Sequence, residues 1–377
     1  MKILYSCLSK SWGGMEMVTI NTIKRLLDKG ITGELLCTTE SRIHIEANNF
    51  GMMIYPVKAP GYFHPLATIR VALTIKKRNY DLIHTHASKD LWLLVPALKI
   101  VGSRAPLLLT KHVGSFISKK DVMHNWLYSR VDYAIAISNV IRQNLLNTTS
   151  LAEDKILLHY NGVDCTKFDP AKHDRNKVRN ELNIADGDIL IGMVGRFSVG
   201  KGHEEFITAA KTLNESHSNL KFIITGEASR GEDSYEAQIK KLANDMDLKN
   251  IIFTGFRDDI PNVIAAMDIF VIPSHSEAFG VALVEAMAMG KPSVCSNSDG
   301  ILDIAVDGET GYLFEKKDAD DLIDKIEMLI NSPVKREEYG RAARKRVVEH
   351  FEFNKLIDEL VNTYKQIIYQ NNQIKDF

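Results

Sequence analysis

The chain has little cysteine, no long apolar run and almost no net charge. Its four cysteines lie far apart in 377 residues without a C-x-x-C pair, so neither a disulfide framework nor a zinc site is expected. No stretch reaches about 18 uninterrupted apolar residues, which argues against a transmembrane helix. Residues 1–8 hold only a short apolar run, which predicts a first strand and not a secretory signal peptide. We therefore expect a protein of the reducing cytoplasm.

What the chain does contain is the composition of a globular protein. Apolar residues make up 45% and charged residues 25%, which argues against a disordered, collagen-like or membrane-spanning class. At about 100 to 200 residues per domain, the length predicts two compact domains, each large enough to bury a core.

The small net charge conceals two halves of opposite sign. Residues 1–168 carry 21 Lys and Arg against 12 Asp and Glu, a balance of +9, and the remainder carries 26 against 36, a balance of −10. A basic half suits an anionic partner such as a membrane surface, a phosphate-bearing acceptor or nucleic acid. Charges scattered over a solvated surface would give the same counts, so both interpretations stay open.

Strand-length apolar runs alternate with helix-length amphipathic segments, which predicts an α/β fold with helices covering parallel sheets. In the first half, strands are predicted at residues 3–8, 34–38, 54–57, 82–85, 107–110, 133–137 and 156–159. After a polar stretch the pattern restarts, with strands at residues 189–195, 222–226, 251–255, 269–273 and 292–295. The sequence therefore predicts two doubly wound domains. They are followed by helical segments from about Arg336 to Tyr369, interrupted near residues 351–353.

Ligands of such sheets bind outside the carboxyl ends of the strands, so chemistry is sought directly after them. The segment Gly195–Gly202 follows a strand and nearly matches the P-loop pattern G-x-x-x-x-G-K-[ST], but Gly202 stands where a nucleoside triphosphatase needs a hydroxyl. Arg196 and Lys201 suit an anion at the amino end of the next helix, which favours a phosphate site without a metal ion. A surface turn with two solvated cations is the alternative.

Two glutamates eight residues apart mark a second segment between a strand and a helix. Glu277 falls in the loop and Glu285 falls more than a turn inside the helix, while Gly280 and Val281 present unpaired amides at the helix start. Carboxylates accept hydrogen bonds from sugar hydroxyls, and free amides suit a phosphate. Glutamates near helix ends are common, so this pair alone does not define a site.

Three features of the first half are weaker. Gly13-Gly14 lies between the first strand and the first helix, where the backbone can approach a phosphate. His112 follows a strand end, which is a cleft position, although a structural histidine is commoner there. His84 and His86 have no third ligand nearby in the sequence and make a poor metal pair.

Together these residues resemble glycosyltransferase family 4. The resemblance covers about residues 1–350 and rests on motifs in the family's order, namely Gly13-Gly14, Asn161-Gly162-Val163-Asp164, Gly195-Arg196 with Lys201, and the E-x7-E pair Glu277 and Glu285. It implies a retaining enzyme of the GT-B fold, with two Rossmann-like domains facing a cleft. The final helix resembles the family's segment that crosses back. The implied domains are therefore 1–168 plus about 354–377, on the acceptor side, and 169–353, for the donor.

The resemblance also implies roles for single residues. Arg196, Lys201, Glu277 and His112 would be catalytic, with the two cations neutralising the donor diphosphate and His112 near the anomeric centre. The donor-binding set would be Gly14, Glu285 on the ribose, Ala278, Phe279, Gly280 and Val281, and, on the nucleobase side, Glu227, Phe256 and Arg257. One departure concerns residues 298–303, Ser-Asp-Gly-Ile-Leu-Asp, where many family members have a G-G-x-x-E run.

The implied reaction moves a hexose from a nucleotide-diphosphosugar to a glycan or glycolipid acceptor of cell-surface polysaccharide or lipopolysaccharide synthesis. The resemblance favours UDP as the nucleotide, while the sequence itself leaves UDP, GDP and ADP open. Same-face attack would retain the configuration, so no carboxylate nucleophile is required. The D-x-D triplets at 186–188, 245–247 and 318–320 follow no buried strand, so we expect a metal-independent reaction without a cofactor. Nucleic acid is not an expected partner.

Two classes of alternative remain, together with a question of location. A GT-B epimerase or phosphorylase would use similar residues, a non-catalytic nucleotide-binding module would keep the donor intact, and a P-loop triphosphatase ranks last because of Gly202. Basic runs lie at residues 76–78 and 119–120, and the first of them follows apolar Leu66, Ile69, Leu73 and Ile75. These runs could bind the inner face of a membrane or form an ordinary solvated surface, and the sequence favours neither interpretation.

Overall fold

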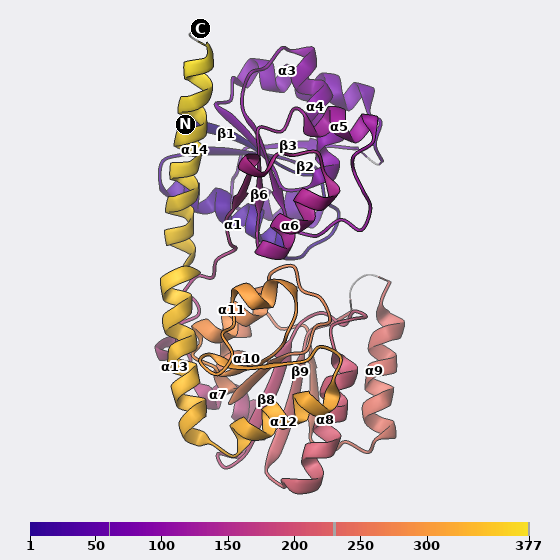
Figure 1. The fold of residues 1–377 in the computed structure, drawn as a ribbon, viewed down its shortest axis with the longest axis vertical. Coiled ribbons are helices and arrows are strands. Elements are labelled where there is room, and N and C mark those ends of the chain that lie inside the picture. Colours follow the sequence, from indigo (N-terminus) through magenta and orange to yellow (C-terminus); the bar gives the residue numbers. More distant parts are fainter. Residues whose placement is uncertain (60, 229–230, 376–377) are drawn as a thin grey trace. The chain divides into compact units, whose positions relative to one another are not determined.

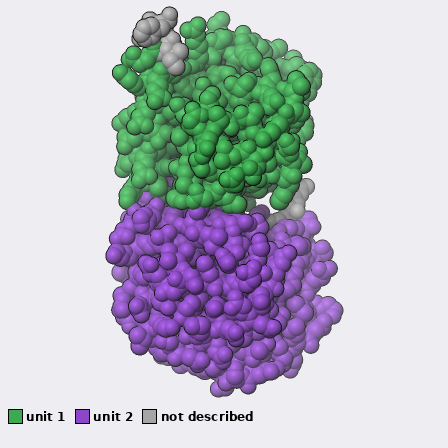
Figure 2. All heavy atoms as spheres, viewed as in Figure 1, with its two compact units in different colours: residues 1–161, 354–377 green, residues 162–353 purple. Residues whose placement is uncertain are grey.

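The computed structural model describes residues 1–59, 61–228 and 231–375. The chain divides into two compact units, residues 1–161 with 354–377 and residues 162–353 (Figure 2). The first boundary lies seven residues before the predicted one, because residues after 161 bond to the second unit. The Val163 amide donates to the Phe351 carbonyl at 2.9 Å, and Arg344 Nη1 donates to the Phe168 carbonyl at 3.1 Å. Residues 376 and 377 of the predicted first domain lie outside the described residues.

Unit 1 contains a seven-stranded parallel sheet in the order β3-β2-β1-β4-β5-β6-β7 (Figure 1). The strands are β1 (Lys2–Cys7), β2 (Thr32–Thr38), β3 (Ile54–Val57), β4 (Leu82–Thr85), β5 (Leu107–Lys111), β6 (Tyr133–Ala136) and β7 (Ile156–Leu158). The helices are α1 (Gly14–Asp28), α2 (Arg42–Asn49), α3 (Pro65–Arg78), α4 (Leu91–Ile100), α5 (Val122–Tyr128), α6 (Asn139–Thr148) and α14 (Phe353–Lys375). Strand order reverses between β1 and β4, where a doubly wound sheet places its crevice.

Unit 2 contains a six-stranded parallel sheet in the order β10-β9-β8-β11-β12-β13. The strands are β8 (Ile189–Val194), β9 (Leu220–Thr225), β10 (Ile251–Gly255), β11 (Ile269–Ile272), β12 (Ser293–Ser296) and β13 (Gly311–Phe314). The helices are α7 (Arg175–Glu181), α8 (His203–Ser216), α9 (Asp233–Asp245), α10 (Ile260–Ala266), α11 (Val281–Ala288), α12 (Ala319–Ile330) and α13 (Pro333–His350). Its order reverses between β8 and β11.

Both sheets confirm the predicted α/β class with two doubly wound domains. One strand, β13, is absent from the sequence prediction. It is four residues long and begins at Gly311, whose φ of +148° and close approach to the Ser293 carbonyl admit no side chain. A short strand that opens on glycine gives little β-propensity signal.

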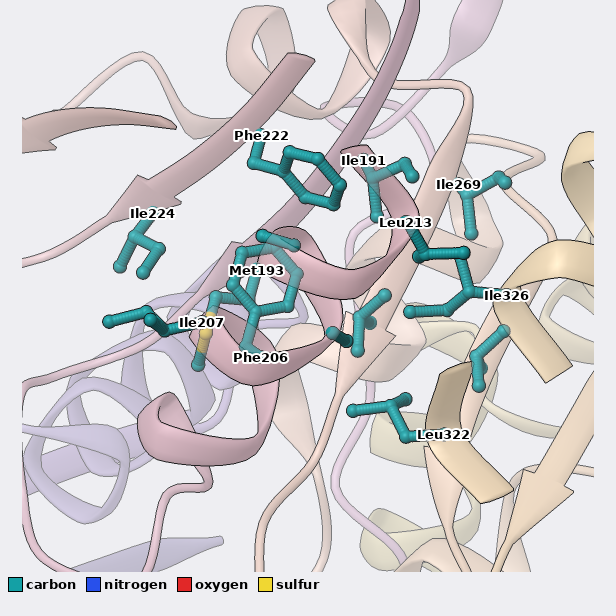
Figure 3. Packing of buried hydrophobic residues seen from close by; sticks show 14 of the residues in the cluster. Ile191, Met193, Phe206, Ile207, Leu213, Phe222, Ile224, Ile269, Leu322 and Ile326 are labelled. Atoms are coloured by element: carbon teal, nitrogen blue, oxygen red, sulfur yellow. The ribbon is translucent and has the colours of Figure 1, made fainter. Parts of the chain in front are cut away.

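The core of unit 2 lies between the sheet and the helices α8 and α12 (Figure 3). Ile191 and Phe222 from the sheet face Phe206 of α8 and Ile326 of α12, and all four are fully buried. Each such side chain contributes about 1.5 to 3 kcal/mol when it leaves water. Rigid strands therefore hold the loops at their carboxyl ends.

The carboxyl-terminal helices are separated where the sequence indicates. Helix α13 ends at His350 and α14 begins at Phe353. The apolar stripe of α14 is buried in unit 1, with Leu356, Ile357 and Tyr364 each at most 5% exposed. No helix in the described part of the chain is both long and apolar enough to cross a bilayer.

Candidate functional site

The predicted donor residues of unit 2 gather where the order of its strands reverses. The loop after β8 and the loop after β11 meet there, because the His275 amide donates to the Gly200 carbonyl at 2.8 Å. Next to this contact, Lys201 Nζ donates to Glu277 Oε2 at 2.6 Å. Both side chains are partly exposed, at 28% and 18%, so a ligand can reach the cation. Two of the predicted catalytic residues are thus direct neighbours although 76 positions separate them.

The close approach of the two loops requires a glycine at position 202. Gly202 has a φ of +78°, and a Cβ built on it would lie 2.1 Å from the Pro273 carbonyl oxygen. A serine or threonine would therefore push the two loops apart. The departure from the P-loop pattern is a packing requirement of this turn, and the structure does not favour the triphosphatase alternative.

The start of α8 carries its own electrostatic features. Gly202 caps the helix, and Glu204 and Glu205 lie in the first turn, where negative charge is favourable. Glu205 Oε1 bonds His275 Nε2 at 2.6 Å. Arg196 lies exposed in the loop that leads to this helix. The loop thus carries one exposed and one partly exposed cation.

Helix α11 begins at Val281 after Gly280, which adopts a φ of +110°. The first amides of a helix have no intrahelical acceptor and suit an anion. Glu285 lies one turn further along, partly buried, and burial raises its pKa to about 7, opposed by the positive charge of Lys167. Within the part of the chain that the structure describes, its carboxylate forms no hydrogen bond. It is therefore placed to accept one from a ligand hydroxyl.

The loop before α11 is held by the segment that departs from the family pattern. The Gly300 amide donates to the Glu277 carbonyl at 2.9 Å, and Ser276 Oγ donates to Asp299 Oδ2 at 2.5 Å. A Cβ on Gly300 would lie 2.5 Å from the Ala278 carbonyl oxygen. The ring of Phe279 is buried and packs on Phe351 at 5.9 Å between centroids, so only the backbone of Phe279 can face a donor.

The predicted nucleobase side is less uniform. Phe256 is 69% exposed after β10, and Glu227 is exposed after β9. The guanidinium of Arg257 is held between Asp259, at 2.7 and 2.9 Å, and Glu181. The neighbouring turns are fastened together, since the Phe197 amide donates to the Glu227 carbonyl at 3.1 Å. Arg257 thus braces this edge, and its contact with a base stays a prediction.

Two of the D-x-D aspartates that raised the metal question accept hydrogen bonds from backbone amides. Asp318 accepts from the amides of Asp320 and Asp321 at the start of α12, both at 3.0 Å. Asp188 Oδ2 accepts from the Ala185 amide at 3.0 Å. Across residues 1–59, 61–228 and 231–375 there is no cluster of three or more His, Cys, Asp or Glu that could hold a metal ion.

In unit 1, Gly14 opens helix α1. The preceding Gly13 donates its amide to Glu16 Oε2 at 2.9 Å, which fixes the turn. A Cβ on Gly14 would meet nothing within 4 Å. The backbone of Gly14 is therefore open to a ligand, and its pairing with a phosphate stays a prediction.

His112 is placed at the carboxyl end of β5 but lies almost wholly buried, at 7%. Its Nε2 lies 2.9 Å from Nδ1 of His86, and the two rings stack. Burial, together with the neighbouring charge of Lys111, lowers the pKa of His112 to about 3. His112 is therefore neutral at physiological pH and can act only as a hydrogen-bonding group.

A hydrogen-bond network close to this histidine carries no signal in the sequence and was not predicted. His84 Nδ1 bonds the Tyr364 hydroxyl at 2.6 Å, and His84 Nε2 bonds Thr110 Oγ1 at 2.7 Å. The Tyr364 hydroxyl also lies 2.6 Å from that of Tyr5. Both nitrogens of His84 are thus engaged in protein hydrogen bonds, which removes the case for a His84–His86 metal pair. No signal in the sequence links Tyr364 to a histidine 280 positions earlier.

Asp90 is a second buried group that the sequence analysis missed. It is 1% exposed and accepts from Ser6 Oγ at 2.6 Å and from the Leu8 amide at 3.1 Å. Burial raises its pKa to about 6. It anchors the end of β1 to the segment after β4.

A cavity of about 170 Å³ lies elsewhere in unit 1, between β1–β3 and α3, and none of its lining residues is a predicted site residue.

Two family models match the chain. The model described as Glycosyltransferase Family 4 matches residues 12–167, and the model described as Glycosyl transferases group 1 matches residues 174–346. The two matches account for most of both units.

The chain is also similar to named proteins. It is 29% identical over 239 residues to the capsular polysaccharide biosynthesis glycosyltransferase CapM of Staphylococcus aureus, covering 63% of this chain but only 62% of that protein. It is 28% identical to an Escherichia coli UDP-Gal:alpha-D-GlcNAc-diphosphoundecaprenol alpha-1,3-galactosyltransferase, over 78% and 77% of the two chains. The fold matches Anabaena Alr3699/HepE in complex with UDP-glucose with a TM-score of 0.83, 24% identity and coverage of 97% and 100%.

Proposed function

Because the chain belongs to the glycosyltransferases, with a family 4 domain followed by a group 1 domain in a GT-B fold, we propose that it is a retaining hexosyltransferase that uses a UDP-sugar. The observation that carries the proposal is the contact of Lys201 with Glu277 at the strand reversal of unit 2. It joins a cation for the diphosphate to a carboxylate for the sugar. The UDP-glucose complex of the Anabaena protein supports the choice of nucleotide.

For the acceptor we propose a glycan or glycolipid precursor of a cell-surface polysaccharide or lipopolysaccharide. The support comes from the names of the relatives, one a capsular polysaccharide enzyme and one a galactosyltransferase acting on a diphosphoundecaprenol-linked sugar. The positive balance of residues 1–168 is consistent with an anionic acceptor.

The proposed mechanism centres on the leaving group. As the glycosidic bond breaks, negative charge develops on the nucleoside diphosphate, and fixed cations lower the barrier. Arg196 and Lys201 supply those cations, so that no metal ion or cofactor is assigned to the step. On donor binding, Lys201 exchanges its contact with Glu277 for the diphosphate, which frees Glu277 to accept a sugar hydroxyl.

The remaining residues position the donor. Glu285 accepts hydrogen bonds from the ribose, and the amides at Gly280 and Val281 receive an oxyanion. Neutral His112 bonds the sugar near the anomeric centre, with His86 fixing its ring. The acceptor hydroxyl attacks from the face of the departing phosphate and passes its proton to that phosphate as the bond to the donor breaks. The configuration is thereby retained, so no enzyme nucleophile is assigned.

A peripheral place at the inner membrane face is a separate proposal with its own support. Leu66, Ile69 and Leu73 of α3 are exposed, at 82%, 49% and 61%, whereas Ile75 is buried in the core. Lys76 and Lys77 follow on the same helix, while Arg78 is paired with Glu34. Exposed apolar residues beside lysines suit an anionic bilayer surface.

Sedimentation with vesicles that contain anionic lipid at low salt tests this membrane proposal. The wild-type chain should be pulled down and Leu66→Glu should remain in the supernatant. Met328→Glu, an equally charged change at another exposed apolar position, should sediment as the wild type does. If the wild type stays in the supernatant, the membrane proposal is wrong.

Thermal unfolding with a panel of nucleotide sugars tests the donor, because a ligand that binds only the folded state raises its melting temperature. UDP-sugars should raise the Tm of the wild type, and the shift should vanish in Arg196→Ala and Glu285→Ala. Arg341→Ala, which removes an exposed arginine of α13, should keep the full shift. No shift with any nucleotide or nucleotide sugar would contradict the donor site.

Release of free UDP distinguishes this function from its rivals. A transferase releases UDP in proportion to the acceptor consumed. A GT-B epimerase interconverts sugars without consuming an acceptor, a phosphorylase requires inorganic phosphate, and a binding module leaves the donor intact.

A further inference from the structure

Two lysines, Lys111 and Lys119, interact with each other at the carboxyl end of β5. Lys111 is the last residue of the strand and is only 8% exposed. Lys119 lies half-buried in the following loop. Its amide donates a hydrogen bond of 2.7 Å to the carbonyl of Thr148, which fastens the loop to α6. The backbone therefore holds both lysines at this position.

This arrangement is electrostatically unfavourable in the ligand-free protein. Burial and the adjacent positive charge of Lys119 lower the pKa of Lys111 to about 8, and burial also lowers the pKa of Lys119. Among the described residues, neither lysine forms an ion pair with a carboxylate. Two cations withdrawn from water without a counter-ion cost folding free energy that an anion would restore.

The groups around the lysines are also hydrogen-bond donors. Lys111 Nζ lies 3.3 Å from Ser88 Oγ, in the turn that leads into α4. The hydroxyl of Tyr128 lies beside Ser88. Tyr128 is 2% exposed, and its hydroxyl forms no hydrogen bond within the described residues. A buried hydroxyl beside Ser88, the residue that Lys111 contacts, indicates together with the two lysines a missing acceptor.

Asp121, the one acidic residue in positions 112–121, is already engaged. Asp121 caps α5 through the amides of Met123 and His124, both at 3.1 Å, and bonds the His124 ring at 2.5 Å. The carboxylate that could have neutralised the lysines is thus used to start a helix. The loop that carries Lys119 keeps its charge available for a ligand.

We propose that Lys111, Lys119, Ser88 and Tyr128 form a binding site for a phosphate ester or diphosphate group of the acceptor. Two ammonium groups and two hydroxyls match the several oxygens of a phosphate. The site adjoins His112, the next residue after Lys111, and so lies at the end of the sheet where the sugar is expected. This assignment rests on the proposed transferase function, because it makes the anion part of the second substrate.

The test is a calorimetric titration of the UDP-saturated full chain with inorganic pyrophosphate, so that the donor site is filled and only a second anion site is measured. Lys111→Met and Lys119→Met keep the aliphatic stem and remove the charge. Each should weaken pyrophosphate binding by about tenfold or more, the value of a lost charge-assisted hydrogen bond. Lys58→Met, an exposed lysine of the same unit, should bind as the wild type does.

UDP binding, measured first in every variant, shows that the variants are folded. Equal pyrophosphate binding in the wild type and both lysine variants, or no binding to the wild type, would overturn the site. If UDP itself does not bind, the transferase proposal fails, and the same titration of the ligand-free chain still decides whether the anion site exists.

Acceptor assays then separate the two sources of phosphate. A soluble sugar 1-phosphate and a polyprenyl diphosphate sugar are compared at equal concentration with the wild type. Lys119→Met should raise KM for whichever acceptor is used, with little change in KM for the UDP-sugar. A rise in KM for the UDP-sugar alone, with no change in KM for the acceptor, would contradict an acceptor site.

Discussion

The two sheets present different chemistry at the same topological position. At the reversal in unit 2, partly exposed Lys201 and Glu277 face each other on glycine-rich loops. At the corresponding end of unit 1, neutral and buried His84, His86 and His112 lie among tyrosines. Partly exposed charge suits the task of holding a charged donor, whereas the neutral histidines of unit 1 suit an uncharged sugar. The positive charge at that end belongs to Lys111 and Lys119 beside them, which we assign to the acceptor. The difference matches the division of labour proposed for the units.

The largest effect is expected from a substitution that separates the two loops of unit 2. In Gly202→Ala, the new methyl group would meet the Pro273 carbonyl, and the residue would keep a positive φ. We expect a loss of about 3 kcal/mol in the free energy of unfolding and loss of UDP binding. Urea unfolding measures the first effect. Gly187→Ala, where a Cβ meets nothing within 4 Å, should stay within about 0.5 kcal/mol of the wild type.

Removal of the Lys201 charge in unit 2 should affect the reaction more than the stability of the fold. Lys201→Ala is expected to lower kcat/KM about 100-fold, because one donor to the developing charge is lost. Its Tm should hardly change, since a partly exposed ion pair contributes at most about 1 kcal/mol. Lys211→Ala, on helix α8 that follows this loop, is the control and should retain activity. A drop in Tm without a drop in kcat/KM would assign Lys201 to the fold instead.

In unit 1 we expect the opposite result, namely a substitution that affects the stability of the fold. Tyr364→Phe removes the hydroxyl shared by Tyr5 and His84 and leaves buried polar atoms unsatisfied. We expect a loss of about 1 to 3 kcal/mol in stability by urea unfolding. Tyr369→Phe, at a 66% exposed position of the same helix, should show almost none. Equal stability of the two variants would mean that the network does not support unit 1.

A smaller effect joins stability to binding at Glu285. Its pKa of about 7 lies above the ordinary value of 4.5, so the folded state binds more protons between those pH values, and stability falls as pH rises through that window. Glu285→Gln removes this cost, and at pH 8 it should gain about 1 to 2 kcal/mol. UDP-sugar affinity should rise with pH in the wild type, as the carboxylate forms, and be weak and flat in the variant. A stability gain without a loss of affinity would remove Glu285 from the donor site.

The donor half was more accessible to sequence analysis than the acceptor half, for physical reasons. Charges and glycines directly after strands, such as Lys201 and Gly280, carry local signals of turns and anion binding. Strand positions followed from apolar periodicity, except for the short β13. Tyr364 and Asp90 carried no such signal, because burial and partners from distant segments give them their role. The contact of Lys201 with Glu277 likewise required the fold.

Helix α14 gives unit 1 an unusual order of assembly. The segment from Asn354 onward completes a unit whose other residues end at Asn161, and the whole of unit 2 is encoded between them. On the ribosome, the strands of unit 1 therefore emerge first, but their contacts with Tyr364 can form only after all of unit 2 has been synthesised. Folding of the first unit thus depends on contacts of very long sequence separation, which form slowly. A release of the nascent chain before α14 would leave the apolar surface beneath that helix uncovered and open to aggregation.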